Sequence, residues 1–157
     1  MTISEGETCP NFSLPDERGE MVALTDIKGR PFVLYFYPKD DTSGCTREAV
    51  DFTGLKRDFD AVGVTVFGVS PDPVKKHQKF IEKHDLAVRL LADEEKSLLS
   101  AFGIWVEKSM YGRKYMGVER TTALIDADGK IVRIWEKVKV PGHAEEVLEA
   151  AKQLAAS

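Results

Sequence analysis

Strand-like and helix-like segments alternate along this sequence, and that alternation restricts the possible folds more than any other feature. Residues 32–37 (FVLYFY) are aromatic and branched and lie between Gly29 and Pro38, which is typical of a buried strand. Apolar positions in residues 45–61 recur every three or four residues, as in a helix packed on one face. The same reasoning predicts strands over residues 64–69 and 88–91, helices over 73–84 and 94–102, paired strands over 121–125 and 130–135, and a final helix over 143–156. This order predicts an α/β fold with a mixed sheet covered on both faces.

The N-terminal segment predicts a small hairpin beside this sheet. Residues 11–14 and 21–24 each alternate between apolar and polar side chains. Pro15, Asp16 and Gly19 lie between them and are typical turn residues.

The composition is that of an ordinary globular protein. The 157 residues are 43% apolar and 31% charged, without repeats or linkers, so we expect one domain over residues 1–157. A net charge of −4 provides no attraction to nucleic acid or to an anionic membrane. The longest apolar run has six residues, far fewer than the ~20 of a membrane helix. Glu5 and Glu7 stand where a signal peptide would be basic and then apolar, so we expect a cytoplasmic protein with no nucleic-acid or membrane partner.

Cys45 lies where the strand predicted at residues 32–37 gives way to the helix predicted at 45–61. Free N–H groups in the first turn of a helix stabilise an anion, and a thiol there can have its pKa lowered from about 8.5 to roughly 3.5–7.5. A cysteine is also commonly an inert, buried apolar residue. Polar residues surround this one at 40–43 and 46–47, which favours a reactive thiol over a core position.

Three neighbours of Cys45 each have a structural and a functional interpretation. Thr42, or Ser43, fits an N-cap of the helix, and the Thr42 hydroxyl is equally placed to bond a thiolate or a substrate. Pro38 ends the strand, and it would also stiffen the loop and shield the thiol from water. Glu48, one turn into the helix, either complements the helix dipole or orients a nearby cation. Both interpretations are open at each position.

Other cysteine chemistries and cofactor sites lack the residue spacing that they require. Neither position 42 nor position 48 is cysteine, which excludes a Cys-x-x-Cys redox pair. A cysteine hydrolase would need a histidine partner, and His77, His84 and His143 keep that alternative open. No cluster has metal-ligand spacing, and glycine-rich phosphate-binding patterns are absent from the sequence. We therefore expect neither a metal nor a cofactor.

The segment YPKDDTSGCTREA, which begins at Tyr37, resembles the active-site motif of the peroxiredoxins. Its core P-x-x-x-T-x-x-C falls at Pro38, Thr42 and Cys45, and it is most similar to the bacterioferritin comigratory protein or peroxiredoxin Q branch. The segments GETCPNFSLPD, VFGVSPDPVKKHQKF and YGRKYMGVERTTALIDADGKI resemble family segments in the same order, so the resemblance covers essentially the whole chain. It implies a thioredoxin-like fold, which agrees with the α/β alternation.

The resemblance also implies an activity and a set of site residues. It identifies a thiol-dependent peroxidase that reduces hydrogen peroxide and organic hydroperoxides, with thioredoxin, glutaredoxin or a small thiol as reductant. By this resemblance Cys45 attacks the peroxide, Thr42 holds it, and Pro38 keeps water from the sulfur. Arg120, in VERTT, becomes the guanidinium beside the sulfur, and Glu48 the acid that orients it. An arginine suits that role because it is permanently charged and donates two hydrogen bonds, although the residues alone do not distinguish this arginine from others.

The chain departs from this branch where the catalytic cycle is completed. Many members carry a second, resolving cysteine at the position of Val50 or in the following helix, where residues 75–86 contain none. The only other thiol is Cys9, which stands where the family usually has a small residue, and Ser43 replaces the usual proline. We therefore expect a one-cysteine cycle that an external thiol resolves, in a monomer or weak homodimer. A two-cysteine cycle through Cys9 and a non-enzymatic redox sensor on the same fold are the alternatives.

Overall fold

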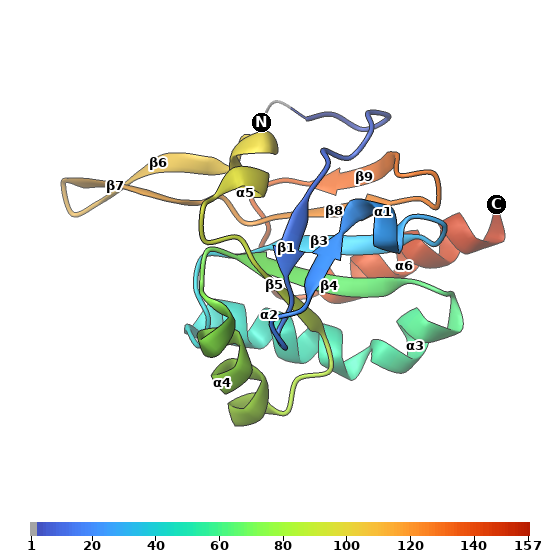
Figure 1. Cartoon of the computed structure of the whole chain (residues 1–157), viewed down its shortest axis with the longest axis horizontal. Helices are drawn as coiled ribbons and strands as arrows, with labels where there is room; N and C mark the ends of the chain where they lie inside the picture. The colour runs from blue at the N-terminus through green and yellow to red at the C-terminus, as the bar shows by residue number, and fades with distance from the viewer. Residues whose placement is uncertain (1–2) are drawn as a thin grey trace.

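The computed structural model describes residues 3–157 and has a five-stranded sheet at its centre, with strand order β5-β4-β3-β8-β9 (Figure 1). The strands are β3 (Phe32–Phe36), β4 (Thr65–Ser70), β5 (Arg89–Ala92), β8 (Thr121–Ile125) and β9 (Ile131–Trp135). β3, β4 and β5 are parallel, whereas β8 runs antiparallel to β3 and β9 antiparallel to β8. The predicted mixed sheet is therefore confirmed.

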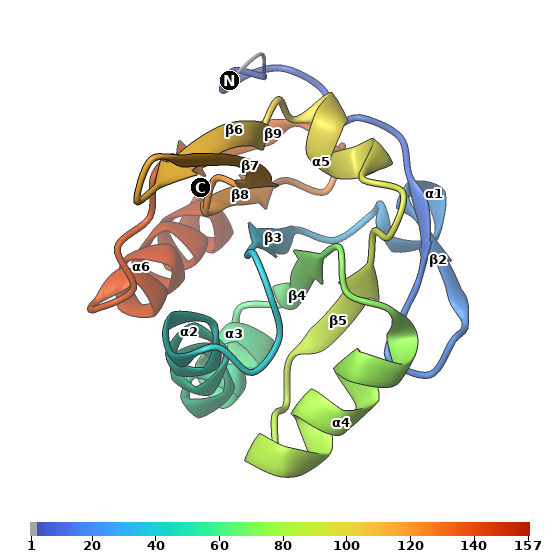
Figure 2. The ribbon, with the colours of Figure 1, turned by 90° about the vertical axis from the view of Figure 1, so that its left-hand side faces the viewer.

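Helices and a small hairpin cover both faces of this sheet (Figure 2). One face carries α2 (Ser43–Gly54), α3 (Lys56–Ala61) and α6 (His143–Ala156). The other carries β1 (Ser13–Pro15), β2 (Met21–Ala23), α1 (Leu24–Ile27) and α5 (Ser97–Ala101). The remaining helix, α4 (Val74–His84), packs along β5 at the edge of the sheet. Because β1 and β2 pair antiparallel, the predicted N-terminal hairpin is also confirmed.

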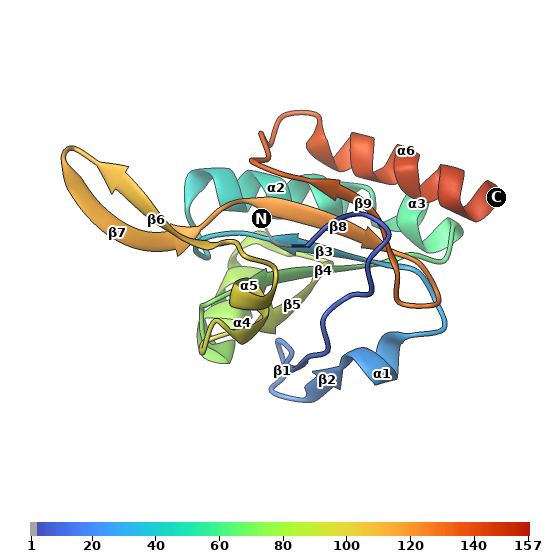
Figure 3. The same cartoon turned by 90° about the horizontal axis from the view of Figure 1, so that it is seen from above.

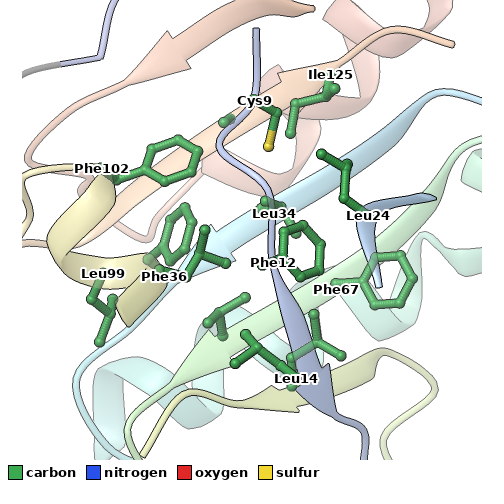
Figure 4. Packing of buried hydrophobic residues seen from close by; sticks show 14 of the residues in the cluster. Cys9, Phe12, Leu14, Leu24, Leu34, Phe36, Phe67, Leu99, Phe102 and Ile125 are labelled. Atoms are coloured by element: carbon green, nitrogen blue, oxygen red, sulfur yellow. The ribbon is translucent and has the colours of Figure 1, made fainter. Parts of the chain in front are cut away.

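The side chains of β3 alternate between two hydrophobic cores. Leu34 and Phe36 belong to the core under the N-terminal hairpin and α5, while Val33 and Tyr35 belong to the core under α2 and α6. All four are fully buried, as expected for a central strand with both faces covered. Figure 4 shows the first core, which also contains the side chain of Cys9. The sheet thus separates two distinct packing environments.

The single helix predicted over residues 45–61 is in fact two helices. α2 begins at Ser43 and ends at Gly54, and Leu55 leaves the helical conformation with φ −104° and ψ 9° before α3 begins. Glycine is one of the weakest helix formers, which explains a break at this point. Phe59 of α3 nevertheless packs in the same core as α2, so the predicted apolar face survives the break.

Two other predicted boundaries differ from the structure for local reasons. The helix predicted over residues 94–102 begins only at Ser97, because Lys96 has a left-handed φ of 60°. The Asp93 carboxylate then accepts hydrogen bonds from groups in the first turn of α5. Leu24, predicted as the end of a strand, starts α1 instead.

A second hairpin, β6 (Trp105–Met110) and β7 (Arg113–Val118), was not predicted from the sequence. It extends away from the body of the molecule at one end of the sheet (Figures 1 and 3). Most of its side chains are exposed, Tyr111 by 99%, so neither strand shows the alternation of a half-buried strand. No helix within residues 3–157 is long and apolar enough to cross a membrane.

Candidate active site

Cys45 lies in the first turn of α2, at one end of the central sheet. β3 ends at Phe36, and a loop over residues 37–42 leads to Ser43, where α2 begins. The first N–H groups of a helix have no partner within it, so the sulfur lies near a partial positive charge. Cys45 is only 2% exposed, so its polar loop does not leave the thiol open to solvent. The strand-to-helix junction predicted for this cysteine is present.

The guanidinium of Arg120 lies directly beside this sulfur. Nη2 of Arg120 donates a hydrogen bond to Sγ of Cys45 at 3.2 Å. Arg120 immediately precedes β8, whose first residue Thr121 pairs with Phe36 at the end of β3. The sheet register therefore brings the arginine to the same end as the cysteine loop. Burial lowers the pKa of Arg120, but the nearby Glu48 and Cys45 raise it by more, so the pKa lies above its ordinary value.

Glu48 holds the other side of the same guanidinium. It follows Cys45 by one turn of α2, and its Oε1 accepts a hydrogen bond from Nη1 of Arg120 at 2.6 Å. Burial raises the pKa of Glu48 to about 7, while the charge and hydrogen bond of Arg120 act in the opposite direction. Within residues 3–157 its second oxygen, Oε2, has no hydrogen-bond partner. Glu48 and Cys45 therefore contact different nitrogens of one guanidinium, Nη1 and Nη2 respectively.

Thr42 and Pro38 lie in the loop before α2. Thr42 occupies the N-cap position, but its hydroxyl makes no capping bond and instead donates to the carbonyl oxygen of Lys39 at 2.9 Å. Thr42 is exposed and Pro38 is half-buried. The structure thus joins Cys45, Glu48 and Arg120 by direct contacts, and among the described residues no hydrogen bond joins Thr42 to the sulfur.

The three histidines that kept a hydrolase open are bonded to other groups. His77 and His84 on α4 each bond an aspartate of the loop before α2. His143, at the start of α6, bonds the hydroxyl of Thr122 at 2.8 Å. None of their ring nitrogens bonds the sulfur of Cys45 in the part of the chain that the structure describes. The geometry therefore gives no support to a catalytic Cys–His pair.

Cys9 lies on the opposite side of the sheet from Cys45. It is 2% exposed and packs in the first core with Leu34 and Phe36, whereas Cys45 packs in the second core (Figure 4). Its Sγ approaches the carbonyl oxygen of Pro10 at 3.5 Å, and burial raises its pKa to about 12. Both cysteines are free thiols. Cys9 has the surroundings of a small core residue, as expected.

The sequence analysis missed one buried polar residue next to the site. Asp40 belongs to the polar segment around Cys45 in the sequence, yet it is buried and bonded to Tyr37 and His77. A sequence signal did exist, because His77 falls on the apolar face of its predicted helix and a histidine there needs a polar partner. Asp40, three residues after the predicted strand, is one of the acidic loop residues that could supply this partner.

The chain matches a known protein family over most of its length. Residues 6–134 match the AhpC/TSA family. The chain is 47% identical over 154 residues to the protein named peroxiredoxin Bcp of Bacillus subtilis, covering 98% of each chain. It is also 47% identical over 148 residues to the putative peroxiredoxin bcp of Coxiella burnetii, covering 94% of this chain and 98% of the relative.

Solved structures show the same fold. A cysteine-to-serine mutant of Xylella fastidiosa PrxQ superposes with a TM-score of 0.93 at 39% identity and covers 99% of both chains. The bacterioferritin comigratory protein of Xanthomonas campestris, studied for alkyl peroxide reduction, superposes with a TM-score of 0.87 at 42% identity over 92% of both chains. The thioredoxin-like architecture implied by the sequence is therefore confirmed.

Proposed function

Because this chain belongs to the AhpC/TSA family as a peroxiredoxin, a thiol-dependent peroxidase, we propose that Cys45 is its reacting thiol and that an external thiol completes a one-cysteine cycle. The observation that carries the first part is the 3.2 Å contact between Nη2 of Arg120 and Sγ of Cys45. A fixed positive charge at that distance favours the thiolate, which is the nucleophilic form of cysteine.

In the proposed first step the Cys45 thiolate attacks one oxygen of a peroxide. The S–O bond forms as the O–O bond breaks, which leaves a sulfenic acid on Cys45 and releases water or an alcohol after the departing oxygen takes a proton. Negative charge moves from sulfur to the peroxide oxygens during this step. Donors already aimed at that charge stabilise the transition state more than the ground state, and Arg120, held by Glu48, supplies them.

Thr42 and Pro38 fit the roles of holding the peroxide and keeping out water. The Thr42 hydroxyl proton is engaged by the carbonyl oxygen of Lys39. Its oxygen lone pairs are therefore available to accept a hydrogen bond from the O–H group of a peroxide. Pro38 has no N–H group and lies half-buried in the same loop, which suits a group that covers the sulfur without binding water.

The position of Cys9 supports the one-cysteine part of the proposal. A disulfide needs two Cα atoms within roughly 7 Å, whereas Cys9 and Cys45 lie in separate cores on opposite faces of the sheet. In the proposed second step a donor thiol attacks the sulfenic sulfur, forms a mixed disulfide and releases water. A second donor thiol then reduces that disulfide and restores Cys45. Thioredoxin, glutaredoxin or a small thiol is the proposed donor, and the protein acts as a monomer or weak homodimer.

The test is peroxide consumption with a thiol donor, using hydrogen peroxide and an organic hydroperoxide as substrates. Wild type and Cys9→Ala should turn over at the same rate, and Cys45→Ser should be inactive. Mass spectrometry of non-reduced digests should trap the mixed disulfide on Cys45. A bridge between the two cysteines, together with loss of turnover in Cys9→Ala, would establish a two-cysteine cycle instead. One oxidation of Cys45 without turnover, with every donor, would establish a redox sensor.

A further inference from the structure

Asp40, in the loop before α2, makes three hydrogen bonds although its neighbours in the sequence are exposed. Its Oδ1 accepts a hydrogen bond from the Tyr37 hydroxyl at 2.5 Å, and its Oδ2 lies 2.6 Å from Nδ1 of His77. Its backbone N–H donates to Oδ2 of Asp72 at 2.7 Å. The residue is buried, so these bonds are shielded from water. One residue of the loop therefore has both its backbone and its side chain fixed.

His77 connects this loop to α4 and the end of β5. The ring is 0% exposed, and its Nε2 lies 3.0 Å from the carbonyl oxygen of Leu91. A carbonyl oxygen can only accept, so Nε2 carries a proton and donates it. The remaining bond joins Nδ1 to Oδ2 of Asp40 and holds one proton between them. Both ring nitrogens are thereby engaged, and the imidazole has one orientation that satisfies them.

The backbone anchor of Asp40 is equally fixed. Asp72 follows β4, and its Oδ2 also accepts a hydrogen bond from the hydroxyl of Ser70 at 2.8 Å. Ser70 is the last residue of β4 and is fully buried. The loop is therefore attached to the central strand β4 and to the edge strand β5, in addition to β3, from which it emerges.

We propose that the Asp40–His77 pair is a positioning device that sets the geometry of the loop around Cys45. Asp40 lies between Lys39, whose carbonyl oxygen accepts the Thr42 proton, and Thr42 itself. Fixing Asp40 therefore fixes the direction in which the Thr42 oxygen presents its lone pairs. The inference rests on the proposed function, because only a peroxide reaction at Cys45 needs that direction to be fixed. Neither Asp40 nor His77 touches the reacting atoms.

Asp41 provides a natural comparison within the same loop. It too bonds α4, through Lys83 at 2.7 Å and His84 at 2.8 Å, but its carboxylate is 43% exposed. An exposed ion pair contributes little to structure, since water competes for both partners. Asp41 has φ 61°, a left-handed conformation that asparagine adopts as readily as aspartate. Asp41→Asn thus removes the exposed ion pairs without straining the backbone, and it is the control for Asp40→Ala. Alanine is used at position 40 because an asparagine there could still donate a hydrogen bond from Nδ2 to Nδ1 of His77.

The experiment measures two reactions of Cys45 in the full chain. The first is oxidation by hydrogen peroxide, which uses the positioned loop and is followed by rapid quenching and mass spectrometry. The second is alkylation by iodoacetamide, which needs a reactive and accessible thiol but no bound peroxide. In Asp40→Ala, which cannot bond His77 or Tyr37 through its side chain, we expect oxidation to slow by at least about tenfold, because displacement of a reacting group by ~1 Å has such effects. Alkylation should be as fast as in wild type or faster, because a released loop exposes a sulfur that is now buried. Asp41→Asn should match wild type in both reactions.

His77→Phe, which has no nitrogen to bond Asp40, provides a second route if Asp40→Ala does not fold, with the same expected split between the two reactions. The double variant should be no slower in oxidation than the slower single variant, because both changes break one contact. Oxidation at the wild-type rate in folded Asp40→Ala or His77→Phe would overturn the inference, and so would an equal loss of both reactions. If Cys45 of the wild type does not react with peroxide at all, the proposed function itself fails.

Discussion

Arg120 donates a hydrogen bond from Nη2 to Sγ of Cys45 at 3.2 Å, although 75 residues separate the two along the chain. The contact exists because β8 pairs with β3 in a register that sets Thr121 against Phe36. Arg120 directly precedes the first of these residues, and the cysteine loop directly follows the second. The same fixed sheet register therefore places both partners at one end of the sheet, so the site is preorganised before any substrate arrives.

Replacing Arg120 with methionine should slow oxidation of Cys45 by peroxide about 10²–10³-fold, equivalent to about 2.7–4 kcal/mol, as for loss of one oxyanion donor. Methionine fills similar space but offers neither charge nor N–H groups. The measurement is the second-order rate constant for peroxide. Arg113→Met is the control, because Arg113 is exposed on β7 and should behave as wild type. Equal losses in the two variants would show that Arg120 does not stabilise the transition state of the peroxide reaction.

Replacing Glu48 with glutamine should separate activity from stability. Burial raises the pKa of Glu48 to about 7, so the folded state favours the protonated form relative to the unfolded chain. This contribution to the free energy of unfolding is fully present below the pKa that Glu48 has in the unfolded chain, and it is lost as the pH rises through about 7. Glutamine has no charge to bury, so its contribution does not change with pH. As the pH rises from about 5 to about 8, the unfolding free energy of Glu48→Gln should therefore increase by up to about 3 kcal/mol relative to that of wild type. Peroxide oxidation should nevertheless slow, since an amide holds the guanidinium less firmly than a carboxylate.

Denaturant unfolding at the two pH values measures the first effect, and the peroxide rate constant measures the second. A variant that is as active as wild type would show that Glu48 does not orient Arg120. A stability difference that does not change with pH would show that Glu48 does not titrate in this range.

The main elements of the fold were predictable because the spacing of apolar side chains along each element indicates which of its faces is buried. The final helix was predicted over residues 143–156, and α6 has those bounds. The β6–β7 hairpin was not predictable from periodicity, because solvent faces most of its side chains, as Tyr111 illustrates. The break at Leu55 follows Gly54, a weak helix former, but the apolar spacing continues across it to Phe59, so periodicity alone predicts one helix.

Only those parts of the site that lie within one continuous segment were predictable from the sequence. The position of Cys45 at a helix start follows from local sequence, and so does the approximate position of Thr42. The contact with Arg120 depends on the pairing of β3 with β8, a tertiary property, and only the family resemblance selected that arginine. The hydroxyl bond from Thr42 to Lys39 depends on loop geometry in the same way. The position of His77 on the apolar face of its helix indicates that it needs a polar partner, but only the tertiary structure identifies that partner as Asp40.

Gly68 of β4 should not tolerate even an alanine. A Cβ atom at this position would lie 2.6 Å from Cζ of Tyr35 and 2.8 Å from Cδ2 of Leu90, which is closer than such atoms can approach. Because both side chains are fully buried, neither has room to move. Gly68→Ala should therefore lose about 1–3 kcal/mol of unfolding free energy, the usual effect of overpacking. The measurement is chemical denaturation of the reduced protein.

Gly54→Ala is the control for this change. Gly54 is helical at the end of α2, and a Cβ atom there would meet nothing within 4 Å. Alanine is favoured over glycine in a helix by up to about 1 kcal/mol, so this variant should be as stable as wild type or more so. Equal stability of Gly68→Ala and wild type would contradict the close packing of β4 against Tyr35.

His143 should make the protein sensitive to acid. Burial, with a further contribution from the charge of Arg120, lowers the pKa of His143 from 6.5 to about 4. As the pH falls, the unfolded chain therefore binds this proton at a higher pH than the folded chain does. This contribution to the free energy of unfolding is fully present above about pH 6.5 and is lost as the pH falls toward 4. Over that range the loss amounts to at most about 3 kcal/mol of unfolding free energy.

His143→Gln removes the titrating imidazole and tests this origin of acid sensitivity. The variant loses packing against Phe52 and Trp135, so it should be less stable than wild type at neutral pH. Its unfolding free energy should then fall less than that of wild type between about pH 7.5 and pH 4, because no imidazole remains to be protonated. Glu48 titrates with the opposite sign over part of this range, but it is present in both proteins, so the comparison cancels its contribution. If both proteins lose the same stability on acidification, His143 is not the group that the acid protonates.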